Sequence, residues 1–189
     1  RLSPALPDRD KRLAMSDILI RPARMEDAAA LSEAGARTFV ETFMDGFGIP
    51  YPKDDLAVFM EQVFSLEATQ ARLADPAMGW WIGERDGQLL GFANTGPNAL
   101  LHPDARPGET ELKRLYILKE AQGLGLGTRL LKVAMDWMTE HGTGAQWIGV
   151  WSGNLKARKL YAAYGFEKAG EYQYPVGSWL DDEFILRRG

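Results

Sequence analysis

The sequence predicts an α/β fold in which one mixed, mostly antiparallel sheet is flanked by helices. An Asp-Gly pair at 86–87 lies between two apolar runs, and such a pair favours a tight two-residue hairpin. Residues 111–118, ELKRLYIL, alternate as a strand does. Apolar residues recur at helical spacing over 25–43 and 126–138. Strands that alternate with helices in this way indicate a sheet covered by helices.

The first half of the chain contains the predicted first strand and three helices. Residues 1–14 are polar and contain proline, so we set them aside as a cloning remnant or a flexible extension. One domain is expected over 15–189, a usual length for a single core. The Gly- and Pro-rich stretch GFGIPYP at 46–52 ends the long helix. The expected elements are a strand at 18–21 and helices at 25–43, 53–64 and 66–74.

The second half of the chain is predicted to form a hairpin, then a strand, a helix, a strand and a helix, and then a second hairpin. Three prolines mark 96–108 as a loop. Gly165 is placed to end the helix expected at 155–164. The expected strands are 80–85, 88–95, 111–118, 146–151, 171–176 and 183–187, with helices at 126–138 and 155–164.

Composition excludes several classes of protein. The chain has 189 residues, a formal net charge of −4 and no cysteine, which removes disulfides, thiolate metal sites and a thiol nucleophile. A broad basic surface for nucleic acid is not expected at this charge. No apolar run reaches the roughly 18 residues of a membrane span, and a cytoplasmic location fits best. His102 and His141 show no metal-ligand spacing, so no metal is expected.

The loop QGLGLG at 122–127 lies between a predicted strand and a predicted helix. Glycines at alternate positions expose backbone N–H groups at a helix N-terminus, an arrangement that favours an anionic diphosphate. A Walker A loop requires a lysine after its last glycine, and Thr128 and Arg129 stand there instead. A Rossmann fingerprint starting at Gly123 requires Gly or Ala at 128, and no acidic residue ends the next strand.

Two motifs resemble those of the GNAT superfamily of N-acetyltransferases. The strand followed by Gln122, Gly125 and Gly127 resembles its acetyl-CoA signature, and NLKARKLYAAYGF at 154–166 resembles its second signature. The resemblance covers about 18–187, and the first helix and terminal hairpin look most like bacterial PaiA-type polyamine acetyltransferases. It implies a central sheet that splays at the acetyl-CoA site. The cofactor-binding residues that it implies are Leu115, Tyr116, Ile117, Gln122, Gly123, Leu124, Gly125, Leu126, Gly127, Thr128, Asn154 and Tyr161.

An amine acceptor must lose a proton before it can attack a thioester. For a lysine-like amine this costs roughly 4.6 kcal/mol at pH 7. Glu111, at the start of the central strand, is the expected base, with Glu109 or a water chain as alternatives. Tyr161 occupies the position that the resemblance assigns to the general acid, although it also belongs to an apolar helix stripe. Asn154 stands where a helix N-cap belongs, so a ligand contact and a cap both remain open.

The acceptor is the least determined part of the prediction. Glu41 and Asp45, near the break after the first long helix, are expected to bind the amine, with a solvated helix face as the alternative. The resemblance implies direct transfer of acetyl from acetyl-CoA to a small primary amine, with spermidine or spermine leading. A peptide or protein N-terminus, an antibiotic amine and a non-catalytic acyl-CoA sensor are the alternatives. The oligomeric state is open, with a homodimer as one option.

Overall fold

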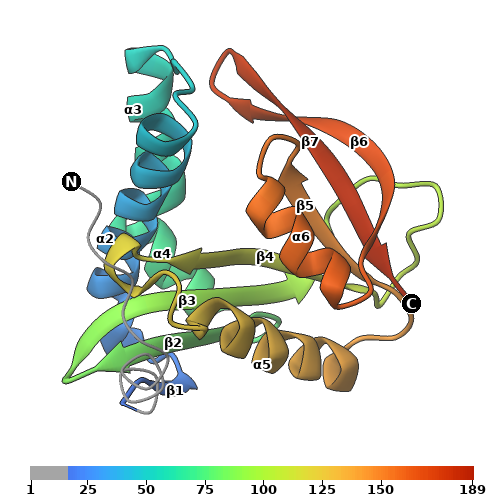
Figure 1. Ribbon diagram of the computed structural model, residues 1–189, viewed down its shortest axis with the longest axis horizontal. Coiled ribbons are helices and arrows are strands. Elements are labelled where there is room, and N and C mark those ends of the chain that lie inside the picture. Colours follow the sequence, from blue (N-terminus) through green and yellow to red (C-terminus); the bar gives the residue numbers. More distant parts are fainter. Residues whose placement is uncertain (1–16) are drawn as a thin grey trace.

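The computed structural model describes residues 17–189, which form one seven-stranded sheet with helices on both faces (Figure 1). The segment 1–14 that was set aside lies outside the described residues. The strands are β1 (Leu19–Pro22), β2 (Gly79–Arg85), β3 (Gln88–Pro97), β4 (Thr110–Ile117), β5 (Gln146–Trp151), β6 (Glu167–Val176) and β7 (Trp179–Arg188). The α-helices are α2 (Ala28–Phe39), α3 (Lys53–Phe64), α4 (Leu66–Ala74), α5 (Leu126–His141) and α6 (Leu155–Ala163).

The sheet has the order β1-β2-β3-β4-β5-β7-β6, and β4 with β5 is its one parallel pair among the described strands. The predicted mixed, mostly antiparallel sheet is therefore confirmed. Asp86 and Gly87 both have positive φ, of 53° and 75°, as the tight turn between β2 and β3 requires. The terminal hairpin is longer than expected, because β6 and β7 pair from Glu167 to Arg187.

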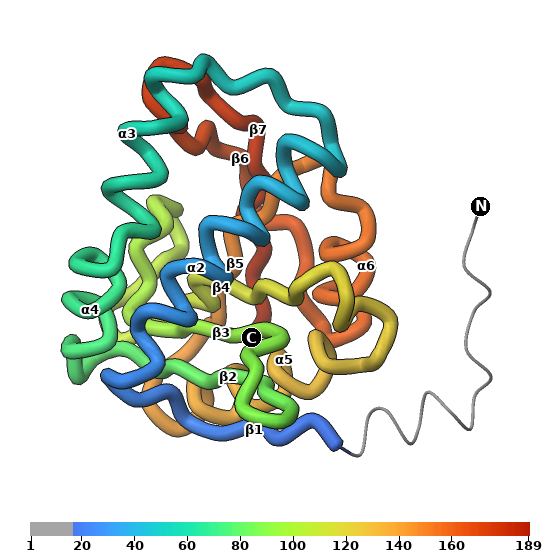
Figure 2. The backbone as a smooth tube through the Cα atoms, turned by 90° about the vertical axis from the view of Figure 1, so that its left-hand side faces the viewer, coloured from blue at the N-terminus to red at the C-terminus, as the bar shows by residue number. Residues whose placement is uncertain are grey.

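Helices cover the two faces of the sheet in different ways. On one face α5 and α6 pack on the strands, with Leu130, Met138 and Tyr161 in the same core cluster as Ile148 of β5. On the other face α2 packs Leu31 on β2 and β3. Figure 2 shows α2, α3 and α4 in front of the sheet, with the β6–β7 hairpin rising beside α3. The hairpin tip is tied there, because Ser178 donates its N–H to Asp55 of α3 over 3.0 Å.

The long helix expected over 25–43 is three segments. A 3₁₀ turn, η1 (Met25–Asp27), precedes α2, and a π-helical segment, η2 (Val40–Gly46), follows it. The wider turns of η2 accompany a chain of ring contacts that leads from Phe43 through Phe47 to Trp151 of β5, with centroids 6.1 and 4.4 Å apart. Aromatic packing onto β5 thus accompanies the departure from regular α-helical hydrogen bonding.

β4 and β5 pair only at one end. Their register runs from Thr110↔Gln146 to Leu112↔Ile148 and then stops. In the same place β4 contains one extra residue relative to β3, because Asn94 pairs with Arg114 and Thr95 with Leu112. The strands therefore separate beyond Leu112, which confirms the splayed sheet that the resemblance implies.

Glu109 holds the closed end of this pair. Its carboxylate accepts N–H groups from Ala145 at 3.1 Å, Arg106 at 2.9 Å and the Trp147 indole at 2.7 Å. Burial opposes ionisation, but these donors outweigh it and hold the pKa of Glu109 below its ordinary value. The start of β5 is thereby tied to the segment that enters β4.

We predict that Glu109→Gln lowers the free energy of unfolding at pH 7 by about 1–3 kcal/mol. An amide has one acceptor oxygen where the carboxylate has two, so at least one buried N–H loses its partner. Because the pKa is depressed in the folded state, the difference from wild type shrinks as pH falls through that pKa. Urea denaturation at several pH values measures it. Asp104→Asn, at a side chain 69% exposed, is the control, and equal effects of the two substitutions contradict the clamp.

Candidate functional site

The separation of β4 from β5 opens a cavity of about 280 Å³. Beyond Leu112 the edge of β4 that faces β5 has no strand partner, so its backbone groups border this opening. Of the predicted pantetheine-binding residues, Leu115 and Tyr116 line the cavity and Ile117 lies at the end of β4 outside the lining. Further lining residues come from α2 to α3, β5 to α6 and the terminal hairpin: Phe39, Phe43, Phe59, Phe64, Trp151, Asn154, Tyr161, Tyr172, Tyr174, Asp181 and Glu183.

The predicted diphosphate loop forms the start of α5. Gly123 and Gly125 have positive φ, of 79° and 76°, and Gly125 is the N-cap. The amides of Leu126, Gly127 and Thr128 belong to the first turn, which lacks intrahelical acceptors, and no acidic residue stands in that turn. A Cβ added at Gly123 meets no heavy atom of residues 17–189 within 4 Å, so these residues leave the space beside the loop free for a ligand.

Side chains of this loop divide between core and surface. Leu126 is 1% exposed and packs in the main core, so only its backbone is available to a ligand, while Leu124 is half-buried at the edge of that core. Gln122 is exposed; it donates to Ile117 O at 3.3 Å and accepts from Lys156 of α6 at 3.3 Å. The loop is thereby connected to the end of β4 and to α6.

α6 places Asn154 and Tyr161 at the cavity. Asn154 is the N-cap, since its Oδ1 accepts the Ala157 N–H at 3.1 Å, and it also lines the cavity. The cap reading is therefore confirmed, and its other amide atom is left for a ligand. Tyr161 is buried, and burial together with nearby Tyr116 raises the pKa of its phenol, which keeps it protonated. Both uses of Tyr161, as core and as cavity wall, coexist.

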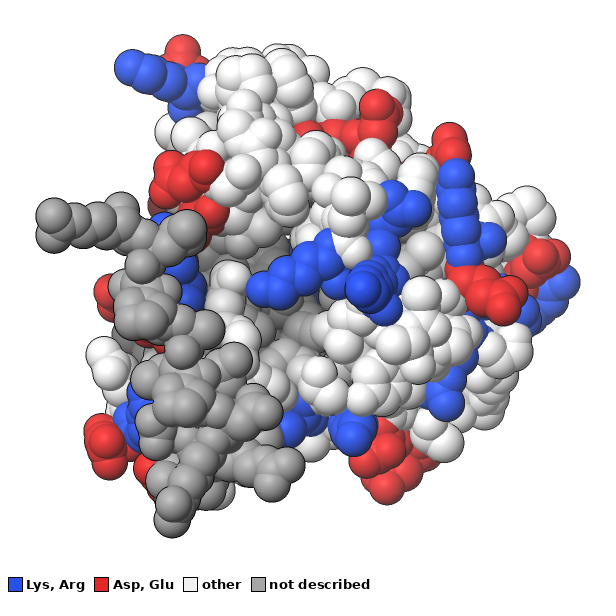
Figure 3. Space-filling model, in the orientation of Figure 1, with Lys and Arg blue, Asp and Glu red and all other residues white. Residues whose placement is uncertain are grey.

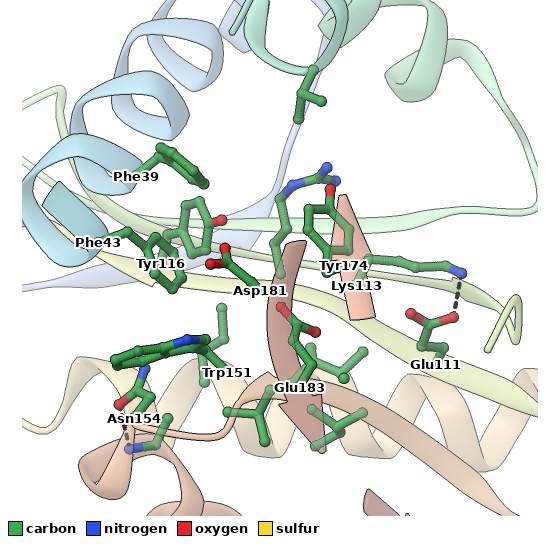
Figure 4. A pocket seen from close by; sticks show the side chains of 18 of the residues that line it. Phe39, Phe43, Glu111, Lys113, Tyr116, Trp151, Asn154, Tyr174, Asp181 and Glu183 are labelled. Carbon is green, nitrogen blue, oxygen red and sulfur yellow. Dashed lines mark hydrogen bonds and ion pairs between the residues drawn. The ribbon is translucent and has the colours of Figure 1, made fainter. Parts of the chain in front are cut away.

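The expected bases lie at the closed end of the opening. Glu111 lines the cavity, but its Oε2 accepts from Lys113 at 2.6 Å and from the Ala99 N–H at 2.8 Å. In Figure 4 this ion pair lies to one side of Glu183, Tyr116 and Trp151. Glu109 does not line the cavity, and its carboxylate serves the clamp described above. The structure thus separates Glu109 from the site.

Two acids on β7 face the cavity, and neither is among the residues expected from the sequence. Asp181 and Glu183 stand on one face of the strand, opposite Tyr174 and Tyr172 of β6. Each oxygen of Asp181 accepts one hydrogen bond, from the Tyr51 hydroxyl at 2.5 Å and from the Trp179 indole at 2.9 Å. The spacing of two residues between Asp181 and Glu183 places both side chains on one face of a strand. The predicted strand begins only at 183, so this spacing was not recognised.

Glu183 is the acid with an altered ionisation. Burial raises the pKa of its carboxyl to about 7; the Tyr172 hydroxyl that donates to Oε2 lowers it in part, while Asp181 and Glu111 raise it. Burial and Glu183 in turn raise the pKa of Tyr172, so that phenol stays a donor. In Figure 4 Glu183 and Asp181 rise from the same strand toward Tyr116 and Tyr174.

The residues expected to bind the amine lie outside the lining. Glu41 and Asp45 are both on η2; Glu41 accepts from Arg37 at 2.8 Å, and Asp45 is exposed. A cation is present in the lining instead. Arg114 of β4 lies over the Phe64 ring at 5.8 Å and has no ion pair among the described side chains.

Charge is unevenly distributed around the site. Figure 3 shows several Lys and Arg side chains gathered near the middle of the face on which α6 lies. α6 itself carries Lys156, Arg158 and Lys159. Within 17–189, no group of three His, Cys, Asp or Glu side chains is arranged to hold a metal ion. None of the helices in that range is both long and apolar enough to cross a membrane.

Comparison with known proteins places these features in a family. An uncharacterised N-acetyltransferase in the pepI 3′ region of Lactobacillus delbrueckii subsp. lactis is 27% identical, covering 78% of this chain and 86% of the relative. Spermine/spermidine N(1)-acetyltransferase of Bacillus subtilis (strain 168) is 28% identical, covering 64% and 82%. The crystal structure of the PaiA N-acetyltransferase of Thermoplasma acidophilum in complex with coenzyme A superposes with a TM-score of 0.71 at 22% identity, covering 90% and 98%.

The family itself is identified over most of the cavity-forming segment. The profile of the acetyltransferase (GNAT) family matches residues 37–166, which run from α2 to the end of the second motif and include both β4 and β5. The chain therefore belongs to the acetyltransferase (GNAT) family of acetyl-CoA-dependent N-acetyltransferases.

Proposed function

We propose that this enzyme transfers acetyl directly from acetyl-CoA to a small primary amine, with both substrates bound at once. The observation that carries the proposal is the parting of β4 from β5 beyond Leu112. It leaves a free strand edge for one substrate and, facing it, a wall of β6 and β7 residues for the other. Because both walls belong to one cavity, no acetylated enzyme residue is needed.

The loop, the strand edge and α6 are proposed to hold acetyl-CoA. The amides of Gly123 to Thr128 suit its diphosphate, since the helix N-terminus of α5 offers free donors and partial positive charge. The backbone of Leu115, Tyr116 and Ile117 suits the pantetheine arm, which has amides of its own to pair. Asn154, with Oδ1 committed to its cap, has N–H donors left for the same arm.

Tyr161 is proposed as the group that protonates the departing CoA thiolate. Its phenol stays protonated at neutral pH, and it lines the cavity. Glu111 stays a prediction as the base. Glu109 is not proposed, because its oxygens are occupied by structural donors away from the cavity.

Spermidine or spermine is proposed as the leading acceptor. One support is the likeness to a spermine/spermidine N(1)-acetyltransferase. Another is the acidic wall of Asp181 and Glu183, which suits a cationic chain. Glu41 and Asp45 stay predictions as outer acceptor residues. A cytoplasmic location and a homodimer also stay predictions.

A second acceptor class is favoured by Arg114. A guanidinium in the lining that has no ion pair within 17–189 suits an amine that also bears a carboxylate, such as a peptide or an amino acid. The two classes differ in charge, so Arg114 repels the first and attracts the second. A single substitution there discriminates between them.

We predict that Gly123→Ala weakens acetyl-CoA binding by about tenfold or more, as measured by calorimetry. Its φ of 79° is costly for alanine by about 1–2 kcal/mol, so the loop must move. Gly87→Ala is the matched control, because its φ is 75° and its Cβ position is equally open, yet it lies in the β2–β3 turn. Equal losses of affinity in the two variants contradict a role for the loop.

We predict that Tyr161→Phe lowers kcat by about 100-fold while the Kd for acetyl-CoA changes little, because a proton donor to the leaving group is lost. Tyr164→Phe, at the C-cap of the same helix, is the control and is expected to keep wild-type kcat. Steady-state thiol release and equilibrium binding measure the two quantities. A Tyr161→Phe enzyme with wild-type kcat removes Tyr161 from the role.

We predict thiol release from acetyl-CoA with spermidine and spermine in a panel that also contains amino acids, dipeptides and an aminoglycoside. In the polyamine reading, Arg114→Gln leaves kcat/KM for spermidine unchanged or higher. In the second reading, it lowers kcat/KM for dipeptides by tenfold or more. Acetyl-CoA binding without thiol release for any amine overturns the proposed function and favours a sensor.

A further inference from the structure

We infer that Glu183 of β7, held in place by Tyr172 of β6, is the catalytic base that takes the proton of the incoming ammonium, in preference to Glu111. The inference rests on the proposed function and names the proton acceptor of that same site. It follows from strand register, from which carboxylate oxygens are committed, and from the charges that surround each carboxyl.

Strand register places Glu183 at the open end of the site. Glu183 pairs with Trp151 of β5, three residues beyond Ile148, where the β4–β5 pairing ends. At about 3.3 Å per residue, Glu183 is level with a point about 10 Å into the opening. Glu111 pairs with Trp147, within the closed part of the pair. The free edge of β4, where a thioester has room to lie, is on the Glu183 side.

Hydrogen bonding leaves Glu183 the least committed acid of the wall. Its Oε2 accepts from the Tyr172 hydroxyl, and within 17–189 no hydrogen bond is made to Oε1. Asp181 has both oxygens occupied, by Tyr51 and Trp179. Glu111 is neutralised by Lys113 at 2.6 Å. Glu111 also keeps Oε1 without a hydrogen bond, but its charge is paired with Lys113; within 17–189, Glu183 alone of the three combines a free oxygen with no ion pair.

Tyr172 is a positioning residue. It stands directly opposite Glu183 in the β6–β7 register, and both side chains pack over Gly149, where a Cβ would collide with the Tyr172 hydroxyl. The absence of a side chain at Gly149 is what admits the pair. The hydroxyl bond fixes Oε2 and so directs Oε1 toward the cavity.

Titratable and charged groups lie around Glu183 on several neighbouring elements. The titratable and charged ones that line the cavity or lie against the pair are Asp181, Tyr172, Tyr174, Glu111, Lys113, Arg114, Tyr116, Tyr161 and Tyr51. Burial and the two acids raise the pKa of Glu183 to about 7, against the lowering effect of Tyr172. A base with this pKa is ionised in about half the molecules at neutral pH and holds a proton more firmly than an ordinary glutamate.

The acceptor arrives as an ammonium, and Glu183 Oε1 takes one of its protons and later releases it to water. The nitrogen lone pair forms the new bond to the acetyl carbon, and the carbon–sulfur bond breaks with its electron pair on sulfur. Tyr161 gives its proton to that sulfur and is restored by the second proton that the nitrogen loses. The products are the amide, the free thiol and one proton in solution.

The test is the pH dependence of kcat, measured with whichever amine the wild-type enzyme accepts. Wild type is expected to lose activity as pH falls below about 7, because Glu183 becomes protonated. Glu183→Gln is expected to lower kcat by about 100-fold and to abolish that dependence. Tyr172→Phe removes the bond that lowers the pKa, so its activity limb moves to higher pH, with kcat restored at pH 9. A purely structural role for Tyr172 lowers kcat without moving the limb.

Two controls make the test specific. Asp182→Asn, at an exposed side chain on the opposite face of β7, keeps the wild-type profile. Glu111→Gln keeps the limb, moved to slightly lower pH because one of the two acids that raise the pKa of Glu183 loses its charge. The inference is overturned if Glu183→Gln retains the limb, or if Glu111→Gln loses it. Acetyl-CoA binding verifies that each variant is folded, and Tyr172→Phe decides alone if Glu183→Gln does not fold. Failure of wild type to acetylate any amine instead overturns the proposed function.

Discussion

The structure depends on the short parallel pairing of β4 with β5. This pairing contains three residue pairs and ends at Leu112 and Ile148. If β4 and β5 paired along their whole length, there would be no cavity between them. If they did not pair at all, the sheet would be divided into two. Glu109 fixes the closed end through buried charge-assisted hydrogen bonds, while the extra residue at Lys113 turns β4 away. One short contact therefore sets both the continuity of the sheet and the position of the opening.

The two walls of the opening present different chemical groups to a ligand. One wall includes the free backbone edge of β4, which offers donors and acceptors without net charge. The other wall is side chains of the terminal hairpin, where tyrosines surround Asp181 and Glu183. Aromatic packing from η2 and α3 closes the space above them, with Phe47 against Trp151 and Phe59 against Tyr174. Burial of this kind strengthens the interactions between the charges that remain in the site.

Local signals in the sequence were sufficient for much of the fold. Asp86-Gly87 specified its turn, Asn154 its cap and Gly165 its helix end, because each depends on a few neighbouring dihedrals. The glycine loop was also visible, although the burial of Leu126 in the core was not distinguished from its neighbours. The π-helical η2 was missed, because aromatic contacts with β5, more than a hundred residues away, accompany its shape.

The acceptor wall could not be read in the same way. Glu183 owes its properties to Tyr172 across a strand pair, to Asp181 two residues away and to loss of water. None of these is encoded near Glu183 as a motif; register and burial create them. Glu111 is expected as the base from its place at the start of the central strand, while its ion pair with Lys113 depends on how β4 is turned at its extra residue.

The buried Glu183 also has a thermodynamic consequence for the folded chain. Its carboxyl binds a proton more tightly when folded, with a pKa of about 7 against an ordinary 4.5, so proton linkage works against the native state as pH rises. The penalty begins near pH 4.5, where the unfolded chain ionises, and is complete above about pH 7, reaching at most about 3 kcal/mol. Glu183 therefore lowers the free energy of unfolding most in the pH range where it is ionised, and the rest of the core has to offset that loss.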